Sequence, residues 1–323
     1  MNERTNPYAS PAVQTMYSHL HDPKAISQDR PATPTANVVP PPRGSDWVVG
    51  VLLLAAVAGC AAQPSEAPAE TPAASASGEV QLPPPGARWD MQLAGDAPLP
   101  ADVTVVERDW WVGRPHASAY TICYVNAFQT QPDESGTDRP DLKRNWPSDL
   151  VLDLEDPEWP GEFLIDIGTT EHRAAAAAHV GTMIEVCARH GAQAVELDNL
   201  DSWTRDLTGT VPFGSKDAVE YARLLVDRAH ALGLAAAQKN AAGLLGPEDQ
   251  AAMGFDFAVV EECGVYGECE AFASAFDGRV LAVEYTNDGL ATACATLPQS
   301  ASVIRRDSGL VTPNEDGYVY RTC

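Results

Sequence analysis

Short runs of apolar and β-branched residues recur through the last three quarters of the chain, and each run ends in polar residues. Such runs are typical of buried strands. They predict eight strands, at 103–109, 120–126, 163–166, 194–198, 234–238, 255–261, 280–285 and 302–307. Helical periodicity lies between several of them. It is clearest over 170–190 and 216–232 and shorter over 247–253, 267–276 and 288–296.

Strands that alternate with helices indicate the α/β class, and eight of them within about 240 residues predict a (β/α)8 TIM barrel. The repeat is irregular. Residues 127–162 are rich in proline and acids and predict a long loop, and residues 90–93 predict an extra N-terminal strand. A doubly wound open sheet is the alternative, but no glycine-rich phosphate loop follows the first strand.

The chain before the barrel divides into two further segments, 1–60 and 61–86, which leaves 87–323 as the folded domain. Trp47 to Gly59 is apolar and uncharged, too short for a membrane-spanning helix but suited to a signal peptide. It ends in Val-Ala-Gly-Cys, which resembles a bacterial lipobox, so we expect lipidation of Cys60. An ordinary signal peptide or a buried strand are the alternatives. Residues 1–42 are either a disordered tail or the product of a start codon assigned too early.

Residues 61–86 are rich in Ala, Pro and Ser and predict a disordered tether. With a lipidated Cys60, this tether would place the domain at the extracellular face of a bacterial membrane, held by the lipid anchor only. Without the lipid, the protein would be secreted.

The formal charge is −24, and nearly all of it lies in residues 87–323. Such a surface repels phosphate backbones and anionic lipids, so no nucleic-acid partner is expected. It would attract a cationic partner or substrate, although solubility alone is an alternative reason for the charge.

In a TIM barrel, functional groups lie at the C-terminal ends of the strands. The predicted strand ends carry Asp109, Asn126, Asp166, Asp198–Asn199, Lys239–Asn240, Glu261–Glu262, Glu284–Tyr285 and Arg306–Asp307. Glycoside cleavage needs one acid to protonate the leaving oxygen and one carboxylate to attack or to activate water. The set therefore favours a glycosidase, without a metal or a cofactor.

Several of these residues fall in longer motifs. Val195–Asp201 (VELDNLD) matches V-E-x-D-N-x-D, Gln238–Asn240 matches L-K-N, and Asp256–Cys263 with Tyr266 and Cys269 matches D-F-A-x-x-E-x-C…Y…C. Val283–Tyr285 matches V-E-Y, and Trp89 with Gln92 and Leu93 matches W-x-x-Q-L. In this order the motifs resemble those of glycoside hydrolase family 114, the endo-α-1,4-polygalactosaminidase-like barrels. The chain departs from the family at Ala127–Gln129, where a Gly-Ser pair is usual, and in the loop 129–162.

The resemblance implies that Asp198 and Glu261 are catalytic, with Asp198 as nucleophile and Glu261 as acid/base in a two-carboxylate, retaining mechanism. Strand alternation puts Glu196 and Asp198 on the same face of one predicted strand. It likewise puts Val259 and Glu261 on the same face of another. Glu284 is the rival acid, because it too ends a strand. The expected substrate contacts are Asp109, Tyr124, Asn199, Asp201, Lys239, Asn240, Glu284 and Tyr285. Lys239 would either bind a sugar hydroxyl or hold a carboxylate in its ionised form. Rings that either stack on sugars or simply pack are Trp110, Trp111, Trp203, Tyr266 and Tyr285.

The resemblance also implies an α-1,4-linked polysaccharide that contains galactosamine, and the acidic domain independently suits an amino-sugar polymer. We expect a monomer. The alternative is a non-catalytic carbohydrate-binding lipoprotein on the same barrel.

Six cysteines remain besides Cys60, and an even number in an exported domain predicts disulfides. Cys263–Cys269 would close a short loop beside Glu261, and Cys294–Cys323 would fix the C-terminal segment. Cys123–Cys187 follows by subtraction. A zinc site is the alternative, but no Cys-x-x-Cys or paired-histidine spacing supports it.

Overall fold

The computed structural model describes residues 80–93, 95–111, 114–132, 138–205 and 211–323. The predicted signal peptide, Cys60 and residues 61–79 of the predicted tether lie outside the described residues. The division at residues 60 and 86 therefore stays a prediction.

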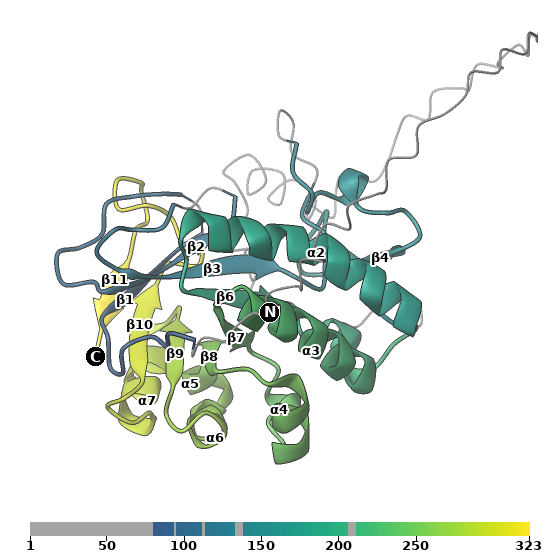
Figure 1. The fold of residues 1–323 in the computed structure, drawn as a ribbon. Coiled ribbons are helices and arrows are strands. Elements are labelled where there is room, and N and C mark those ends of the chain that lie inside the picture. Colours follow the sequence, from purple (N-terminus) through teal and green to yellow (C-terminus); the bar gives the residue numbers. More distant parts are fainter. Residues whose placement is uncertain (1–79, 94, 112–113, 133–137, 206–210) are drawn as a thin grey trace, which may run out of the picture. The chain divides into compact units, whose positions relative to one another are not determined.

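Eight parallel strands form a nearly closed barrel, which confirms the predicted TIM-barrel class (Figure 1). In sheet order they are β1 (Trp89–Gln92), β2 (Val105–Asp109), β3 (Tyr120–Asn126), β6 (Ala194–Asp198), β7 (Ala235–Lys239), β8 (Phe257–Glu261), β9 (Val280–Glu284) and β10 (Ser302–Arg306). The first and last of them meet where Arg306 Nη1 lies 2.6 Å from Asp90 Oδ1. A short strand, β11 (Tyr320–Thr322), pairs antiparallel with β10.

Two strand assignments differ from the sequence-based ones. Residues 89–92 form the first barrel strand and are not an addition to it, because β1 pairs in parallel with β2. Residues 163–165 form β5, which pairs antiparallel with β4 (Val151–Glu155) in a separate two-stranded sheet. An apolar run of three residues is compatible with either setting, so its pattern alone could not exclude it from the barrel. The predicted loop 127–162 thus contains β4 and the 3-10 helix η1 (Lys143–Asn145).

Helices cover the outside of the barrel (Figure 1). They are α2 (Thr170–His190), α3 (Ser215–Ala231), α4 (Pro247–Met253), α5 (Cys263–Tyr266), α6 (Cys269–Ala275) and α7 (Asn287–Thr296), with the 3-10 helices η2 (Ser202–Thr204) and η3 (Ala242–Leu244). The ends of α2 follow from local chemistry. The Thr169 side chain accepts the backbone N–H of His172, and Gly191 ends the helix at φ 90°. No helix in the described part of the chain has the length and apolar content to cross a membrane.

Strand alternation separates two sets of buried side chains. Alternate positions fill the barrel interior, where Ala235 and Ala237 of β7 lie beside the large ring of Phe257 on β8. The intervening positions pack against the helices; on β8 and β9 these are Ala258, Val260, Val280 and Ala282. This alternation decides which polar side chains at the strand ends point into the mouth of the barrel.

The three predicted disulfides are all present, Cys123–Cys187, Cys263–Cys269 and Cys294–Cys323. They connect β3 to α2, close the turn after β8, and tie α7 to Cys323. Sulfurs that are bonded to one another offer no thiolate, so the alternative zinc site on these cysteines is wrong.

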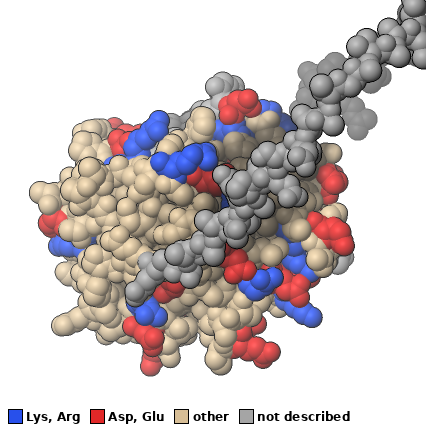
Figure 2. Space-filling model, in the orientation of Figure 1, with Lys and Arg blue, Asp and Glu red and all other residues tan. Residues whose placement is uncertain are grey.

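Acidic and basic side chains are interspersed on the face in view, and no basic patch gathers there (Figure 2).

Candidate active site

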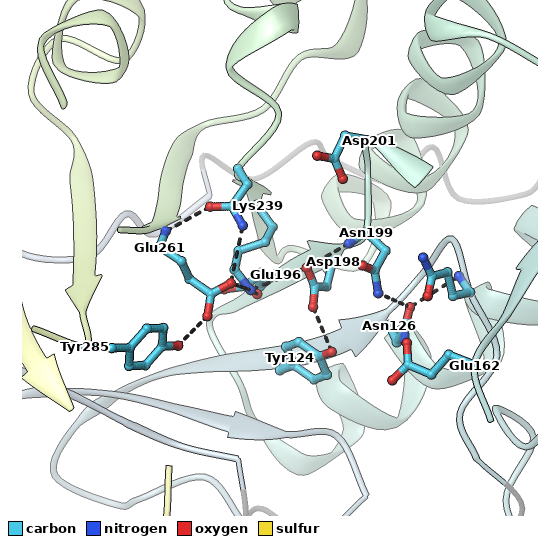
Figure 3. Close-up of polar contacts among 12 residues, drawn as sticks. Tyr124, Asn126, Glu162, Glu196, Asp198, Asn199, Asp201, Lys239, Glu261 and Tyr285 are labelled. Carbon is cyan, nitrogen blue, oxygen red and sulfur yellow. Dashed lines mark hydrogen bonds and ion pairs between the residues drawn. The ribbon is translucent and has the colours of Figure 1, made fainter. Parts of the chain in front are cut away.

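The inward positions at the ends of four neighbouring strands bring together Asp198 of β6, Lys239 of β7, Glu261 of β8 and, directly after β9, Tyr285 (Figure 3). Each strand is continuously buried up to its last residues, and the polar side chain stands where the strand reaches the mouth. Sequence alternation predicted this placement for Asp198 and Glu261.

The Lys239 ammonium is the centre of the group. Its Nζ lies 3.0 Å from Glu196 Oε1, 3.3 Å from Asp198 Oδ1 and 3.4 Å from Glu261 Oε2. Lys239 is only 1% exposed. A buried ammonium among carboxylates is stable because the opposite charges compensate for its lost hydration.

Asp198 is held by donors on both carboxylate oxygens. The Tyr124 hydroxyl donates to Oδ2 at 2.8 Å, and the backbone N–H of Asn199 donates to Oδ1 at 2.7 Å. Together with Lys239 these contacts fix the carboxylate in one orientation. Tyr124 was expected to contact substrate, and the structure makes it a partner of Asp198.

Glu261 has a different set of partners. The Tyr285 hydroxyl donates to its Oε1, and the Asn240 side chain donates to Oε2 at 3.3 Å. Asn240 Oδ1 in turn accepts the backbone N–H of Glu261 at 2.8 Å, so the two residues clamp each other. The Glu261 side chain is 20% exposed against 11% for Asp198, so Glu261 is the more accessible carboxylate.

Two further acids lie beneath the ammonium, Glu196 of β6 and Glu107 of β2, and neither is exposed to solvent. Burial, and next the negative charge of Glu196, raise the pKa of the Glu107 carboxyl well above its usual range. Sequence reasoning missed Glu107. The available signal was its position between Val105 and Asp109, where alternation turns an acid into the barrel interior.

A second polar group adjoins Asp198 and centres on Asn126 of β3. The Asn126 side chain donates to Glu162 at 3.0 Å and accepts from Asn199 at 3.0 Å. Burial, then the negative charges of Asp198 and Asp156, raise the pKa of Glu162 well above its usual range. Sequence reasoning missed Glu162 and also Arg205, which pairs with Asp156 at 2.7 Å, because both come from connecting segments without strand periodicity.

The remaining predicted polar residues lie outside the central group. Asp201 pairs with Arg205 at 3.2 Å and stands apart from Asp198 and Glu261 (Figure 3). Asp109 accepts the backbone N–H of Trp111 at 2.7 Å. Asp166 follows β5 rather than a barrel strand and pairs with His172, and Arg306 pairs with Asp90.

The aromatic candidates divide by exposure. Trp110 is buried, and its indole N–H donates to Asp141. Trp203 is partly buried against the core between the barrel and α2 and α3. Trp111 and Tyr266 are 44% and 50% exposed, so both rings are available for stacking, and Tyr285 is partly exposed at the mouth beside Glu261.

Glu284 does not reach the mouth of the barrel, which corrects its expected roles as substrate contact and rival acid. Alternation points it outward, against α5 and α7, where it is fully buried and its Oε1 accepts the backbone N–H of Gly264 at 2.7 Å. A Cβ at Gly289 would clash with its Oε2. Among the described residues, Glu284 also lies close to the sulfurs of Cys263 and Cys269, but their disulfide leaves no metal-binding thiolate.

Burial raises the pKa of Glu284 to about 7. A carboxyl whose folded pKa exceeds its unfolded value destabilises the fold as pH rises from about 4.5 to about 7. We therefore expect E284Q to gain on the order of 1–3 kcal/mol relative to the unsubstituted protein above pH 7, and little at pH 4. Urea denaturation at several pH values measures this. A difference that did not change with pH would contradict it.

The residues after β6, β7 and β8 share an unusual backbone. Asn199, Asn240 and Glu262 have φ values of 63°, 45° and 54°. Residues other than glycine adopt this left-handed region at a cost, and such residues cluster at functional sites. After β6 this backbone lets the Asn199 N–H donate to the Asp198 carboxylate. After β7 it lets the Asn240 side chain donate to the Glu261 carboxylate.

A TIM barrel with two carboxylates at the ends of nearby strands, on either side of a buried ammonium, has the architecture of a glycoside hydrolase. The model of glycoside-hydrolase family GH114 matches residues 69–323, so the chain belongs to this family and is a glycoside hydrolase.

The solved structures similar to this chain include that of Aspergillus fumigatus Ega3 in complex with galactosamine. It has a TM-score of 0.59 and 21% identity, covering 75% of this chain and 97% of that one. The glycoside hydrolase domain of PelA from Pseudomonas aeruginosa has a TM-score of 0.49 and 12% identity over 72% of this chain and 97% of that one. No curated protein sequence matches the chain.

Proposed function

We propose that the protein is a lipid-anchored, extracellular glycoside hydrolase that cleaves α-1,4-linked, galactosamine-containing polysaccharide by a retaining mechanism. The observation that carries the proposal is the placement of Asp198 and Glu261 on either side of the Lys239 ammonium, at 3.3 Å and 3.4 Å. The substrate class is supported by the motif resemblance, by the galactosamine bound in the Ega3 complex, and by the net charge of −24.

The reaction follows from the two environments. Glu261, the more exposed carboxyl, takes a proton from solvent and gives it to the leaving glycosidic oxygen. Asp198, held by Tyr124 and Asn199, attacks the anomeric carbon as the bond to that oxygen breaks. Water then displaces Asp198 from the covalent intermediate, and Glu261 takes the proton of that water. Two carboxylates that share one ammonium support the short separation, about 5–5.5 Å, that retention requires.

A direct assay tests the proposal. Purified protein is incubated with α-1,4-linked galactosamine polymer, with its N-acetylated form and with an unrelated neutral polysaccharide. Products are measured by mass spectrometry, and the anomer formed first is identified by NMR. Release of galactosamine-containing fragments with retained configuration supports the proposal. Binding without release would favour the non-catalytic carbohydrate-binding lipoprotein, and an inverted product would overturn the nucleophile role of Asp198.

The lipid anchor gives a separate prediction. The apolar segment that ends in Cys60 and the three disulfides both suit an exported protein. We expect mass spectrometry of membrane-extracted protein to find an acylated N-terminal Cys60, and C60A to move the protein to the soluble fraction. A mature N-terminus at another residue, with C60A still membrane-bound, would exclude the anchor.

A further inference from the structure

The floor of the active site contains more negative groups than one lysine can neutralise. Lys239 has three carboxylates within 3.4 Å, those of Glu196, Asp198 and Glu261. Glu107 adds a fourth carboxyl, fully buried and next to Glu196. Four ionised carboxylates around one ammonium in a buried site would carry a large electrostatic cost, so one of the four groups must hold a proton.

The proton belongs on Glu107. Both of its oxygens and Glu196 Oε2 are buried without a hydrogen-bond donor among the described residues, and the neighbouring carboxyl is that of Glu196, so only a proton on one of the two acids can satisfy them. A hydrogen bond between two carboxyl groups requires a proton on one of them. Glu196 is the ionised partner because its Oε1 lies 3.0 Å from the ammonium. Burial and the charge of Glu196 raise the pKa of Glu107 in agreement with this assignment.

We propose that Glu107 and Glu196 share one proton and, through the Glu196–Lys239 ion pair, position the ammonium between Asp198 and Glu261. They are positioning residues, since neither is exposed to substrate. The assignment of Asp198 and Glu261 as the reacting groups rests on the proposed function, but the shared proton does not depend on it.

Among the described residues, the titratable groups around the pair include Asp198 from β6, Lys239 from β7, Glu261 from β8 and Tyr124 from β3, whose ring faces the ammonium at 5.7 Å. β1, β9 and β10 contribute the apolar Met91, Val283 and Ile304 to the same interior cluster. Arg306 of β10 is paired with Asp90.

This arrangement favours one of the two roles expected of Lys239. An ammonium has three N–H donors, and three carboxylate oxygens lie around it, while the side chain is 1% exposed. Lys239 therefore organises the carboxylates and does not bind a sugar hydroxyl.

Infrared spectroscopy tests the shared proton without substrate. At pH 7 the infrared spectrum of the unsubstituted protein minus that of E107Q should contain the C=O stretch of one protonated carboxylic acid. Other neutral acids, such as Glu162, are present in both proteins, so their bands cancel in this difference spectrum. E107Q keeps a donor toward Glu196, so it should remain folded. Absence of the band would overturn the proposal whatever the enzyme cleaves, whereas a band without any polymer cleavage would leave this proposal standing and remove the proposed function.

Kinetics test the positioning role. E196Q removes one negative charge beside Lys239, so both limbs of the pH profile of kcat should move to lower pH, by about one unit. We expect kcat to fall about tenfold or more while KM changes little, because the reacting groups and not the binding groups are displaced. In the matched pair E107Q and E107M, only E107M, which cannot donate to Glu196, should move the profile. An unmoved profile in E196Q, or equal shifts in E107Q and E107M, would refute the positioning role.

Discussion

Turnover is expected to fall by at least 10²–10⁴-fold in D198N and in E261Q, with the fold intact. General acid–base catalysis alone contributes a factor of this size, and loss of a nucleophile should cost at least as much. The amides keep the shape and the hydrogen bonds to Tyr124 and Tyr285, but they can neither attack the anomeric carbon nor release a proton. The measurement is kcat on the polymer together with the thermal unfolding midpoint of each variant.

Two controls sharpen the result. Azide should restore part of the activity when the Asp198 carboxylate is removed, because it can occupy the vacated position as a nucleophile, but it should not replace Glu261 as the acid. E284Q should leave turnover near that of the unsubstituted protein, since Glu284 is buried behind β9 and away from the mouth. Loss of activity in E284Q with retention in E261Q would transfer the acid role to Glu284.

The second large effect is expected from K239M. Removing the ammonium leaves the buried carboxylates of Glu196 and Asp198 and the partly buried Glu261 without a compensating charge. Breaking one partner out of a buried ion pair typically destabilises a protein by about 3–5 kcal/mol. We expect a loss of this size in urea denaturation at pH 7, and a fall in kcat because the two reacting carboxylates repel each other and take up protons.

A double-mutant cycle separates charge from packing. If charge causes the loss, K239M/E196Q should be more stable than K239M, because one of the uncompensated carboxylates is gone. The same loss in the single and the double variant would show that Lys239 contributes through the packing of its methylene groups instead.

Much of the fold and the centre of the site could be predicted from the sequence, because both depend on short-range periodicity. Alternation at the end of a buried strand placed Asp198 and Glu261 in the mouth. Applied to β9, the same rule predicts that Glu284 points outward and Tyr285 inward. Applied to β2, it predicts that Glu107 points into the barrel interior. Glu284 ends a strand as Glu261 does, but it alternates with Leu281 and Val283 of the barrel interior and therefore shares the outer side with Val280 and Ala282.

Other features could not be predicted because they depend on tertiary pairing. Whether residues 163–165 joined the barrel was decided by their pairing with Val151–Glu155, which no local pattern encodes. Glu162 and Arg205 reach the site from connecting segments, where residue spacing carries no information about direction in space. The disulfides could be predicted because Cys263 and Cys269 are close in sequence and Cys323 needs a partner for the C-terminal segment; only Cys123–Cys187 followed by subtraction.

The β4–β5 hairpin bears on how enzymes of this architecture diversify. It is inserted between β3 and α2 and is held both by its own pairing and by bonds to residues 128–130, but it pairs with no barrel strand, so its tip can change without shifting the register of the barrel. Yet Glu162, at the edge of the hairpin, accepts a hydrogen bond from Asn126, and Asn126 in turn accepts one from Asn199, the residue next to Asp198. Natural variation, or a grafted segment, could therefore alter which polymer is accommodated while the reacting groups stay in place, so that substrate range and chemistry evolve on separate parts of one chain.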